Sequence, residues 1–358
     1  MDFFRPDRPC PAPAAHGALD FAELERTGIN PDDVLDFSVN SNPFGPSPLV
    51  RAAIARTPLD RYPDRECLAL RRVLAERLGV SSAQIVVGNG TAELIWLAAF
   101  AFLKPGENVL IVGPTFGEYE RSVRLMSAIP IYWNALPAAG FACDIAAISQ
   151  LLNTADYRAV FLCNPNNPTG QVVSPDVILA WADAHPRTLF IVDEAYLMFV
   201  PGLESVIPNL RPNLLALRSM TKDYALAGLR LGYAVGEARL VEALVNVRPA
   251  WNVNGLAQAA GLAALADAVY YQSSLEKLRD EKTFLLAGLA EAGYSPVPSH
   301  THFFLLPVGN AVRFRQNLLR HGILVRDCTS FGLPGYVRIS PRTRTENQKL
   351  LAHLQHSL

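Results

Sequence analysis

Between residues 84 and 236 the sequence alternates short apolar runs with helical segments, and this alternation constrains the fold more than any other feature. The runs in QIVVG, ENVLIVG, RAVFLC, TLFIVD and NLLALRS are nearly continuous, and several end in a glycine- or proline-containing turn. Continuous apolar strands separated by helices are typical of a mostly parallel sheet that is covered on both faces. We therefore predict an α/β fold built on such a sheet.

Three segments are predicted along the 358-residue chain. Residues 1–45 form an N-terminal arm rich in proline and asparagine, and residues 46–245 form a large domain that contains the sheet. Residues 246–358 form a smaller α+β domain, which the arm joins. This domain begins with a helical region at 256–293 and continues with the strand-like segments HFFLLPV, ILVRDC and YVRISP. A length of this size also favours two domains.

Charge and composition argue against several classes of function. Lys and Arg number 32 against 33 Asp and Glu, without a dense basic run, so we expect no nucleic-acid partner. The apolar run at 95–103 is too short to cross a bilayer, which takes about 20 residues. The five cysteines are scattered without C-x-x-C spacing, and the N-terminus lacks the apolar run of a signal peptide. We expect a soluble, cytoplasmic protein with reduced thiols, no metal site and no membrane partner.

Five segments that carry polar residues or glycines follow predicted strands, which is where ligands bind in an open parallel sheet. Each one alone has an ordinary structural interpretation, such as a tight turn, a core aromatic ring, a salt bridge or a solvated charge. Their presence at the same edge of the sheet favours a common ligand. The segments are VVGNGTAEL (86–94), GPTFGEY (113–119), CNPNNPTG (163–170), IVDEAY (191–196) and SMTKDYALAGLRLGY (219–233).

One ligand, pyridoxal 5′-phosphate, accounts for all five segments. Lys222 is an amine that can form a Schiff base with an aldehyde. The turn at 88–90 opens a helix whose free N–H groups can bind a phosphate, and Arg230 can add a bidentate contact. Asp193 at a buried strand end needs a cation, either a metal ion or an organic cation such as a protonated pyridine. Phe116 can stack on a flat ring.

NPNNPTG, IVDEAY and SMTKDYALAGLRLGYAVG, in this order, resemble the class I/II aminotransferase family of fold type I, from about residue 30 to 355. The resemblance implies a homodimer with active sites at the interface, in which Lys222 forms the Schiff base and Asp193 pairs with the pyridine nitrogen. The other cofactor contacts that it implies are stacking by Phe116, contacts to O3′ by Asn167 and Tyr196, phosphate contacts by Gly90, Thr91, Ser219 and Arg230 with support from Thr221, and Tyr62 lent by the neighbouring subunit.

The segments DFSVNSNPFGPSP and RYPD resemble the branch of this family that contains histidinol-phosphate aminotransferase and threonine-phosphate decarboxylase. Both of these enzymes act on phosphorylated amino compounds, so a second phosphate site is expected. The resemblance implies that Arg338 binds the substrate α-carboxylate and that Arg326 anchors the substrate phosphate. The full set of implied substrate contacts is His16, Gly17, Asn40, Asn167, Arg326 and Arg338.

Features of the arm and of the lysine motif favour the decarboxylase. His16-Gly17 resembles its N-terminal HGG segment, although Ala18 and Leu19 depart from that pattern. RSMTKDYALAGLRLGY resembles its version of the lysine motif, and WNVN at 251–254 resembles its WSVN. We therefore expect a lyase that decarboxylates O-phospho-L-threonine to (R)-1-aminopropan-2-yl phosphate in cobalamin biosynthesis. The alternatives are transamination of histidinol phosphate with 2-oxoglutarate, another aminotransferase of the family, or a non-catalytic cofactor-binding protein.

Overall fold

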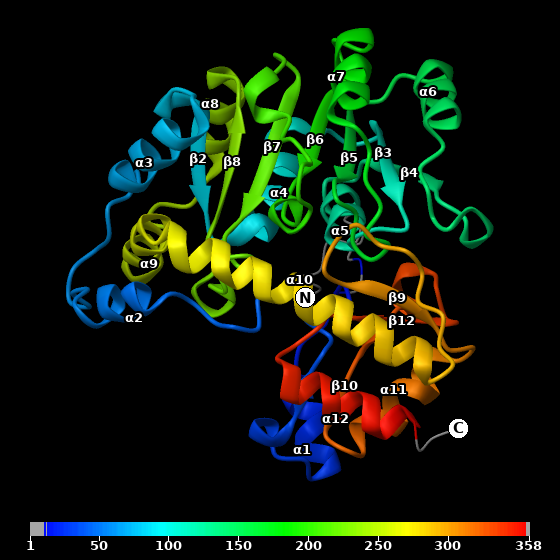
Figure 1. The fold of residues 1–358 in the computed structure, drawn as a ribbon. Coiled ribbons are helices and arrows are strands. Elements are labelled where there is room, and N and C mark those ends of the chain that lie inside the picture. Colours follow the sequence, from blue (N-terminus) through cyan, green and yellow to red (C-terminus); the bar gives the residue numbers. More distant parts are fainter. Residues whose placement is uncertain (1–10, 12, 356–358) are drawn as a thin grey trace, which may run out of the picture.

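The computed structural model of the chain describes residue 11 and residues 13–355. A seven-stranded sheet and its helices form the larger part, and two small sheets with the last helices form the smaller part (Figure 1). The helices are α1 Phe21–Thr27, α2 Pro48–Ala55, α3 Leu68–Leu78, α4 Gly90–Phe102, α5 Glu118–Leu125, α6 Ile145–Thr154, α7 Pro175–Ala184, α8 Ala238–Val247, α9 Gly255–Ala266, α10 Ala268–Glu291, α11 Ala311–Leu319 and α12 Arg344–Gln355. The strands are β1 Leu35–Asp36, β2 Ile85–Gly88, β3 Asn108–Gly113, β4 Ile129–Asn134, β5 Ala159–Cys163, β6 Leu189–Asp193, β7 Leu214–Ser219, β8 Gly232–Gly236, β9 Phe304–Pro307, β10 Ile323–Leu324, β11 Arg326–Asp327 and β12 Tyr336–Ile339.

The large sheet has the order β2-β8-β7-β6-β5-β3-β4. Strands β4, β3, β5, β6 and β7 run parallel to one another, and β8 runs antiparallel to both of its neighbours. The sheet is therefore mostly parallel, as the sequence predicts. The carboxyl ends of β5, β6 and β7 consequently meet at one edge, where the polar segments of the sequence begin.

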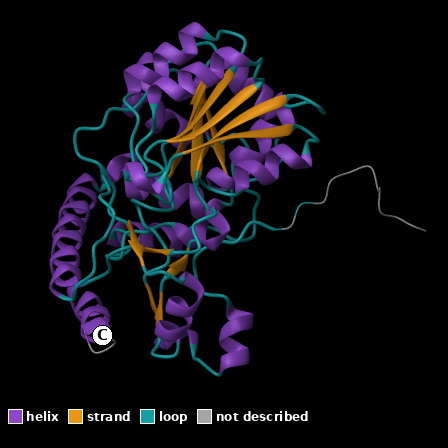
Figure 2. Cartoon of the chain, turned by 90° about the vertical axis from the view of Figure 1, so that its right-hand side faces the viewer, coloured by secondary structure: helices purple, strands orange, loops and turns teal. Residues whose placement is uncertain are grey.

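Both faces of this sheet are buried because successive side chains of a strand point to opposite sides. On one face, Val160 and Phe190 belong to a core that includes residues of α3, α7 and α9. On the other face, their neighbours Phe161 and Ile191 belong to a core that includes residues of α4, α5 and α8. Figure 2 shows helices on both sides of the sheet. This burial explains why the strands are nearly continuous apolar runs in the sequence.

The smaller part is built on the antiparallel sheet β11-β12-β9, whose core includes residues of α10, α11 and α12. The N-terminal arm packs onto it in two places. Strand β1 pairs with β10, and Leu24 of α1 packs against Leu319 and Leu324. Arg315 Nη1 donates to Glu23 Oε1 at 2.7 Å beside this contact. The domain boundaries at residues 45 and 245 stay predictions.

The helical region expected at 256–293 consists of α9 and α10, and Asp267 between them caps α10 by accepting a hydrogen bond from Tyr270 N at 3.2 Å. The apolar segment LRLGYAVG (229–236) predicts a strand, but β8 begins at Gly232, and Arg230 precedes it in a left-handed conformation with φ of 58°. Arg230 therefore lies outside the hydrogen-bonded strands of the sheet. Within residue 11 and residues 13–355, no helix has the length and apolarity that a membrane span requires.

Candidate active site

A cavity of about 520 Å³ lies next to the sheet edge where β5, β6 and β7 end. In the strand register Cys163 pairs with Asp193, and Asp193 pairs with Leu217, so the segments that follow these strands start side by side. A cavity of this volume is typical of small-molecule sites. Its lining includes the predicted residues His16, Gly17, Asn40, Phe116, Asn167, Tyr196, Lys222, Arg230, Arg326 and Arg338.

Lys222 lies in the wall of this cavity, shortly after the end of β7. Its backbone carbonyl accepts a hydrogen bond from Asn42 N at 2.9 Å. Burial lowers the pKa of its amine from 10.5 to about 8, with further contributions from the positive charges of Arg338 and Arg230. The negative charge of Asp193 acts in the opposite direction. A lysine with this pKa is partly unprotonated near neutral pH and can act as a nucleophile.

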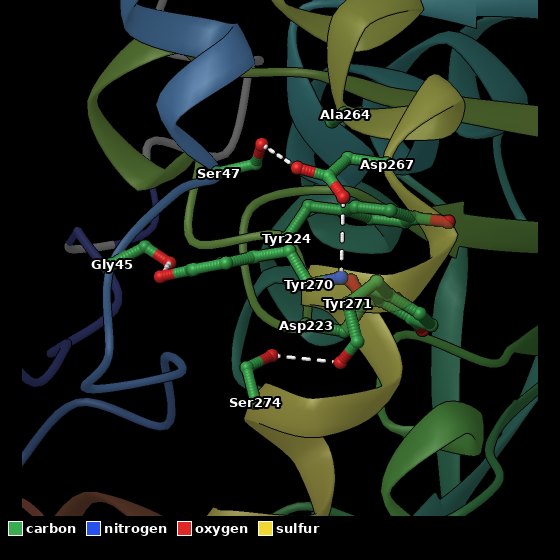
Figure 3. A pocket seen from close by; sticks show the side chains of 9 residues that line it. All are labelled: Gly45, Ser47, Asp223, Tyr224, Ala264, Asp267, Tyr270, Tyr271 and Ser274. Atoms are coloured by element: carbon green, nitrogen blue, oxygen red, sulfur yellow. Dashed lines mark hydrogen bonds between the residues drawn. The ribbon is translucent and has the colours of Figure 1, made fainter.

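The residue after Lys222 is held by a buried polar network (Figure 3). Tyr271 Oη donates to Asp223 Oδ2 at 2.8 Å, and Asn42 Nδ2 donates to the Asp223 carbonyl at 3.1 Å. The cavity beside these groups measures about 10 Å³, which is room for about one water molecule. This region therefore positions Lys222 and offers no space for a second ligand.

Asp193, the last residue of β6, is 4% exposed. Tyr119 Oη donates to its Oδ2 at 2.8 Å, and Ala195 N donates to its Oδ1 at 3.1 Å. Burial raises the pKa of Asp193 from 3.8 to about 6, and these two hydrogen bonds oppose the rise. Because both donors are neutral, a bound cation is the partner that the carboxylate still requires.

The neighbouring carboxylate, Glu194, has a structural role. Arg218 Nη1 lies 3.4 Å from its Oε2, and both side chains are buried. Ser205 Oγ and Val206 N complete its partners at 2.6 and 2.9 Å. The sequence left open a structural salt bridge or a bound cation for the carboxylates of IVDEAY. Glu194 forms the structural salt bridge, and Asp193 is the carboxylate available to a cation.

The start of α4 forms a second polar corner of the site. Gly90 has φ of 81°, and a Cβ there would lie 2.7 Å from Nη2 of Arg230, so the guanidinium group lies directly over this glycine. Thr91 follows in the first turn, whose N–H groups lack partners within the helix. The hydroxyls of Ser219 and Thr221 lie 2.7 Å apart. A helix N-terminus combined with an arginine and hydroxyl groups fits a phosphate.

A buried arginine, Arg338, also lines the cavity. Arg338 Nη1 donates to Asn167 Oδ1, and its Nη2 donates to the Ser38 carbonyl at 2.6 Å. Its Nε is buried and has no hydrogen-bond partner among the described residues. Asn40 Nδ2 donates to Tyr196 Oη at 3.4 Å in the same region. Arg338 therefore retains donor capacity for an anionic group.

The described part of the N-terminal arm covers one side of the cavity. A Cβ on Gly17 would lie 2.6 Å from the Ser38 carbonyl, so the close approach of the arm requires glycine at this position. The ring of His16 lies 5.5 Å from the ring of Phe116. Arg326, at the start of β11, is 8% exposed and lines the same cavity.

Tyr62 is separate from these residues within one chain. Its side chain is 77% exposed, and its ring stacks on Trp251 with centroids 4.6 Å apart. An exposed pair of stacked aromatic rings suits a protein contact. The expected contact of Tyr62 with the cofactor of another subunit stays a prediction.

Sequence reasoning missed several residues of the site. Tyr119, which donates a hydrogen bond to Asp193, lies in the GPTFGEY segment, in the first turn of α5. Glu118, from the same segment, and Trp96 also line the cavity. The signal for Tyr119 is its place in GPTFGEY, a segment that follows a predicted strand at the binding edge of the sheet.

An amine nucleophile, a buried carboxylate and a phosphate-binding corner at the edge of a parallel sheet are the features of a pyridoxal-phosphate enzyme. A model of the family described as Aminotransferase class I and II matches residues 32–354. The chain therefore belongs to this family, and the prediction drawn from its three motifs is confirmed.

Comparison with individual proteins is more specific. The histidinol-phosphate aminotransferase of Anaeromyxobacter sp. (strain Fw109-5) is 37% identical over 93% of this chain and 93% of its own length. The structure of histidinol-phosphate aminotransferase from Sinorhizobium meliloti, in complex with pyridoxal 5′-phosphate, aligns with a TM-score of 0.85 and 25% identity over 95% of each chain. L-Threonine-O-3-phosphate decarboxylase from Porphyromonas gingivalis aligns with a TM-score of 0.78 and 28% identity over 90% of this chain and 98% of that chain. These neighbours confirm the predicted fold type I architecture.

The prediction of a phosphothreonine decarboxylase is wrong. Relatives that are 32–37% identical over 91–94% of this chain are named histidinol-phosphate aminotransferase, which favours the alternative reaction. The lyase activity and the place in cobalamin biosynthesis fall with that prediction. The resemblance of the arm misled because it rests on the pair His16-Gly17. In the structure, His16 Nε2 donates to the carboxylate of Glu118 at 3.0 Å.

Proposed function

We propose that this enzyme transfers the amino group of histidinol phosphate to 2-oxoglutarate. Its cofactor is pyridoxal 5′-phosphate, as the sequence predicts. The observation that carries the proposal is that Lys222 shares one cavity with two buried arginines, Arg326 and Arg338. Histidinol phosphate has one anionic end and 2-oxoglutarate has two, and guanidinium groups bind phosphate and carboxylate alike.

When bound, the cofactor supplies a carbonyl that accepts the amino group and a ring that takes up an electron pair. Lys222 provides the covalent attachment and moves the proton at the substrate Cα, for which a pKa of about 8 is suitable. Asp193 keeps a proton on the ring nitrogen through its negative charge. Arg338 binds the α-carboxylate of 2-oxoglutarate, and Arg326 binds the phosphate of histidinol phosphate or the distal carboxylate of 2-oxoglutarate.

The remaining polar groups hold the cofactor in place. Phe116 covers the ring, and Asn167 and Tyr196 contact its phenolic oxygen. The phosphate is held by Gly90 and Thr91 through the backbone, by Ser219 and Arg230, and with support from Thr221. Gly17 and Asn40 complete the substrate side of the cavity. These assignments extend the sequence-based predictions, and the positions of the residues around one cavity support them.

We further propose that two copies associate and that Tyr62 of each copy reaches the cofactor of the other. Its exposed position next to Trp251 supports this arrangement. We retain the cytoplasmic location as a proposal. Among the described cysteines, Cys67, Cys143, Cys163 and Cys328 are free, which agrees with a reducing compartment.

The test is to incubate the purified, cofactor-loaded protein with histidinol phosphate and 2-oxoglutarate and to measure glutamate. We expect glutamate from the wild type and none from Lys222→Ala, which also loses the visible absorbance of the bound cofactor. In parallel, phosphothreonine is supplied and CO₂ is measured. Release of CO₂ without glutamate formation from histidinol phosphate would overturn the proposal.

A further inference from the structure

Two consecutive residues of the described arm, Ala15 and His16, form hydrogen bonds with Arg326 and Glu118 in the cavity. Arg326 Nη2 donates to the carbonyl oxygen of Ala15 at 2.7 Å. His16 Nε2 donates to Glu118 Oε1 at 3.0 Å. The Ala15 carbonyl thus occupies the arginine that is assigned to the substrate phosphate. The His16 imidazole occupies a buried carboxylate of the same cavity.

Glu118 is held as a fixed acceptor. Its side chain is 5% exposed, and Trp96 Nε1 donates to Oε2 at 2.8 Å. Arg121 Nη1 lies 3.7 Å from Oε1, so His16 supplies the short hydrogen bond to that oxygen. A buried carboxylate oxygen requires a donor. If His16 leaves, Oε1 becomes an acceptor in the cavity wall while the bond from Trp96 keeps the carboxylate in place.

The arm residue, in contrast, is weakly held. The His16 side chain is 48% exposed, and exposed ion pairs contribute little to stability. The hydrogen bond from Ala18 N to Ser38 Oγ, at 2.8 Å, fixes the chain two residues later. Ala18 has φ of 86°, a left-handed conformation that is unfavourable for alanine. Exchange of His16 for another donor therefore costs little.

We propose that Glu118 recognises the imidazole ring of the substrate, and that Ala15 and His16 occupy the substrate positions on Arg326 and Glu118 until histidinol phosphate displaces them. This inference rests on the proposed function and specifies its substrate recognition. An imidazole N–H can donate to Oε1 as His16 does, and Phe116 lies close enough to contact such a ring. A substrate without a donor at this position leaves Oε1 of Glu118 without a short hydrogen bond, which a polar site disfavours.

The same exchange also suits the second substrate. 2-Oxoglutarate has no hydrogen-bond donor for Glu118, and its distal carboxylate would be repelled by this side chain. With His16 returned to Glu118, Oε1 regains its short hydrogen bond, while the distal carboxylate of 2-oxoglutarate replaces the Ala15 carbonyl on Arg326. One short segment of the arm thereby adapts the cavity to two substrates of different chemistry.

The test compares Glu118→Gln with the matched control Glu120→Gln, which alters a carboxylate of the same helix that is 42% exposed and paired with Arg124. The affinity of the cofactor-loaded full chain is measured by calorimetry for histidinol phosphate and for 2-aminopropyl phosphate, which lacks the imidazole. We expect Glu118→Gln to lower the affinity for histidinol phosphate by about tenfold, because a charge-assisted hydrogen bond to the imidazole is lost. The affinity for 2-aminopropyl phosphate should change by less than about twofold. Equal behaviour of the two variants overturns the recognition role.

His16→Ala tests the displacement of the arm by the substrate, and here the affinity is expected to rise. Removal of the competing ring should raise the affinity for histidinol phosphate severalfold. In the wild type, the rate of hydrogen exchange at residues 16–18 should rise when this ligand binds. An unchanged or weaker affinity overturns the displacement and favours direct substrate binding by His16. If the wild type neither binds nor transaminates histidinol phosphate, the proposed function fails and this inference fails with it. If the wild type transaminates but the variants behave alike, only the inference fails.

Discussion

The depressed pKa of Lys222 predicts unusual reactivity of this amine in the cofactor-free enzyme. Its pKa is lowered from 10.5 to about 8, first by burial and then by the charges of Arg338 and Arg230. At pH 7.5 roughly a quarter of the amines would be unprotonated, against about one in a thousand at a pKa of 10.5. The fraction of reactive amine at this pH is therefore raised by about 200-fold.

The assay is trace acetylation of the cofactor-free protein between pH 6 and 11, with the modified peptides counted by mass spectrometry. Labelling of the exposed Lys104 corrects for loss of reagent. We expect Lys222 to titrate with a midpoint near pH 8. Arg338→Met should raise this midpoint, because removing a nearby positive charge favours the protonated amine. Arg342→Met, which removes an arginine paired with Glu346, is the matched control. A midpoint above pH 10 in the wild type, or equal shifts in both variants, would refute the electrostatic argument.

Three further outcomes follow from the contacts of the site. Tyr119→Phe removes the donor to Asp193, so the pKa of Asp193 should rise further and the cofactor should dissociate about tenfold more readily in equilibrium dialysis, with an unchanged circular dichroism spectrum. Arg218→Met leaves Glu194 buried without its cation and should lower the free energy of unfolding by about 3–5 kcal/mol in urea titration. Tyr62→Phe should weaken cofactor binding while light scattering still reports the same oligomer; unaltered binding would remove Tyr62 from the partner's site.

The sheet and the cofactor residues could be predicted from the sequence because their signals are local. A nearly continuous apolar run identifies a buried strand, and the residue that follows it lies at the binding edge of a parallel sheet. Lys222 and Asp193 were found in this way. The conformation of the turn before β8 is harder to predict from the sequence. Arg230 has a left-handed backbone conformation there, and its side chain packs over Gly90, which is distant in the chain.

The choice of reaction could not be predicted from such signals. The prediction of a decarboxylase rests on the lysine motif, on WNVN and on the arm, where a histidine and a glycine resemble a phosphate-binding segment. What a histidine binds is decided by the group that the fold places opposite it. Here that group is Glu118, 102 residues away in the chain, and no spacing rule connects the two positions. A short polar motif outside a regular element therefore carries little information about the substrate.

The pair Asp193-Glu194 shows how partners, rather than burial, separate a functional carboxylate from a structural one. Both side chains are buried, and burial raises the pKa of each. Glu194 has a cation, Arg218, within the protein, so its charge is already compensated. Asp193 has neutral donors in Tyr119 and Ala195, which orient the carboxylate without compensating its charge. A buried carboxylate that is oriented but not neutralised is a site prepared for a cationic ligand, and the protonated ring of the cofactor supplies that cation.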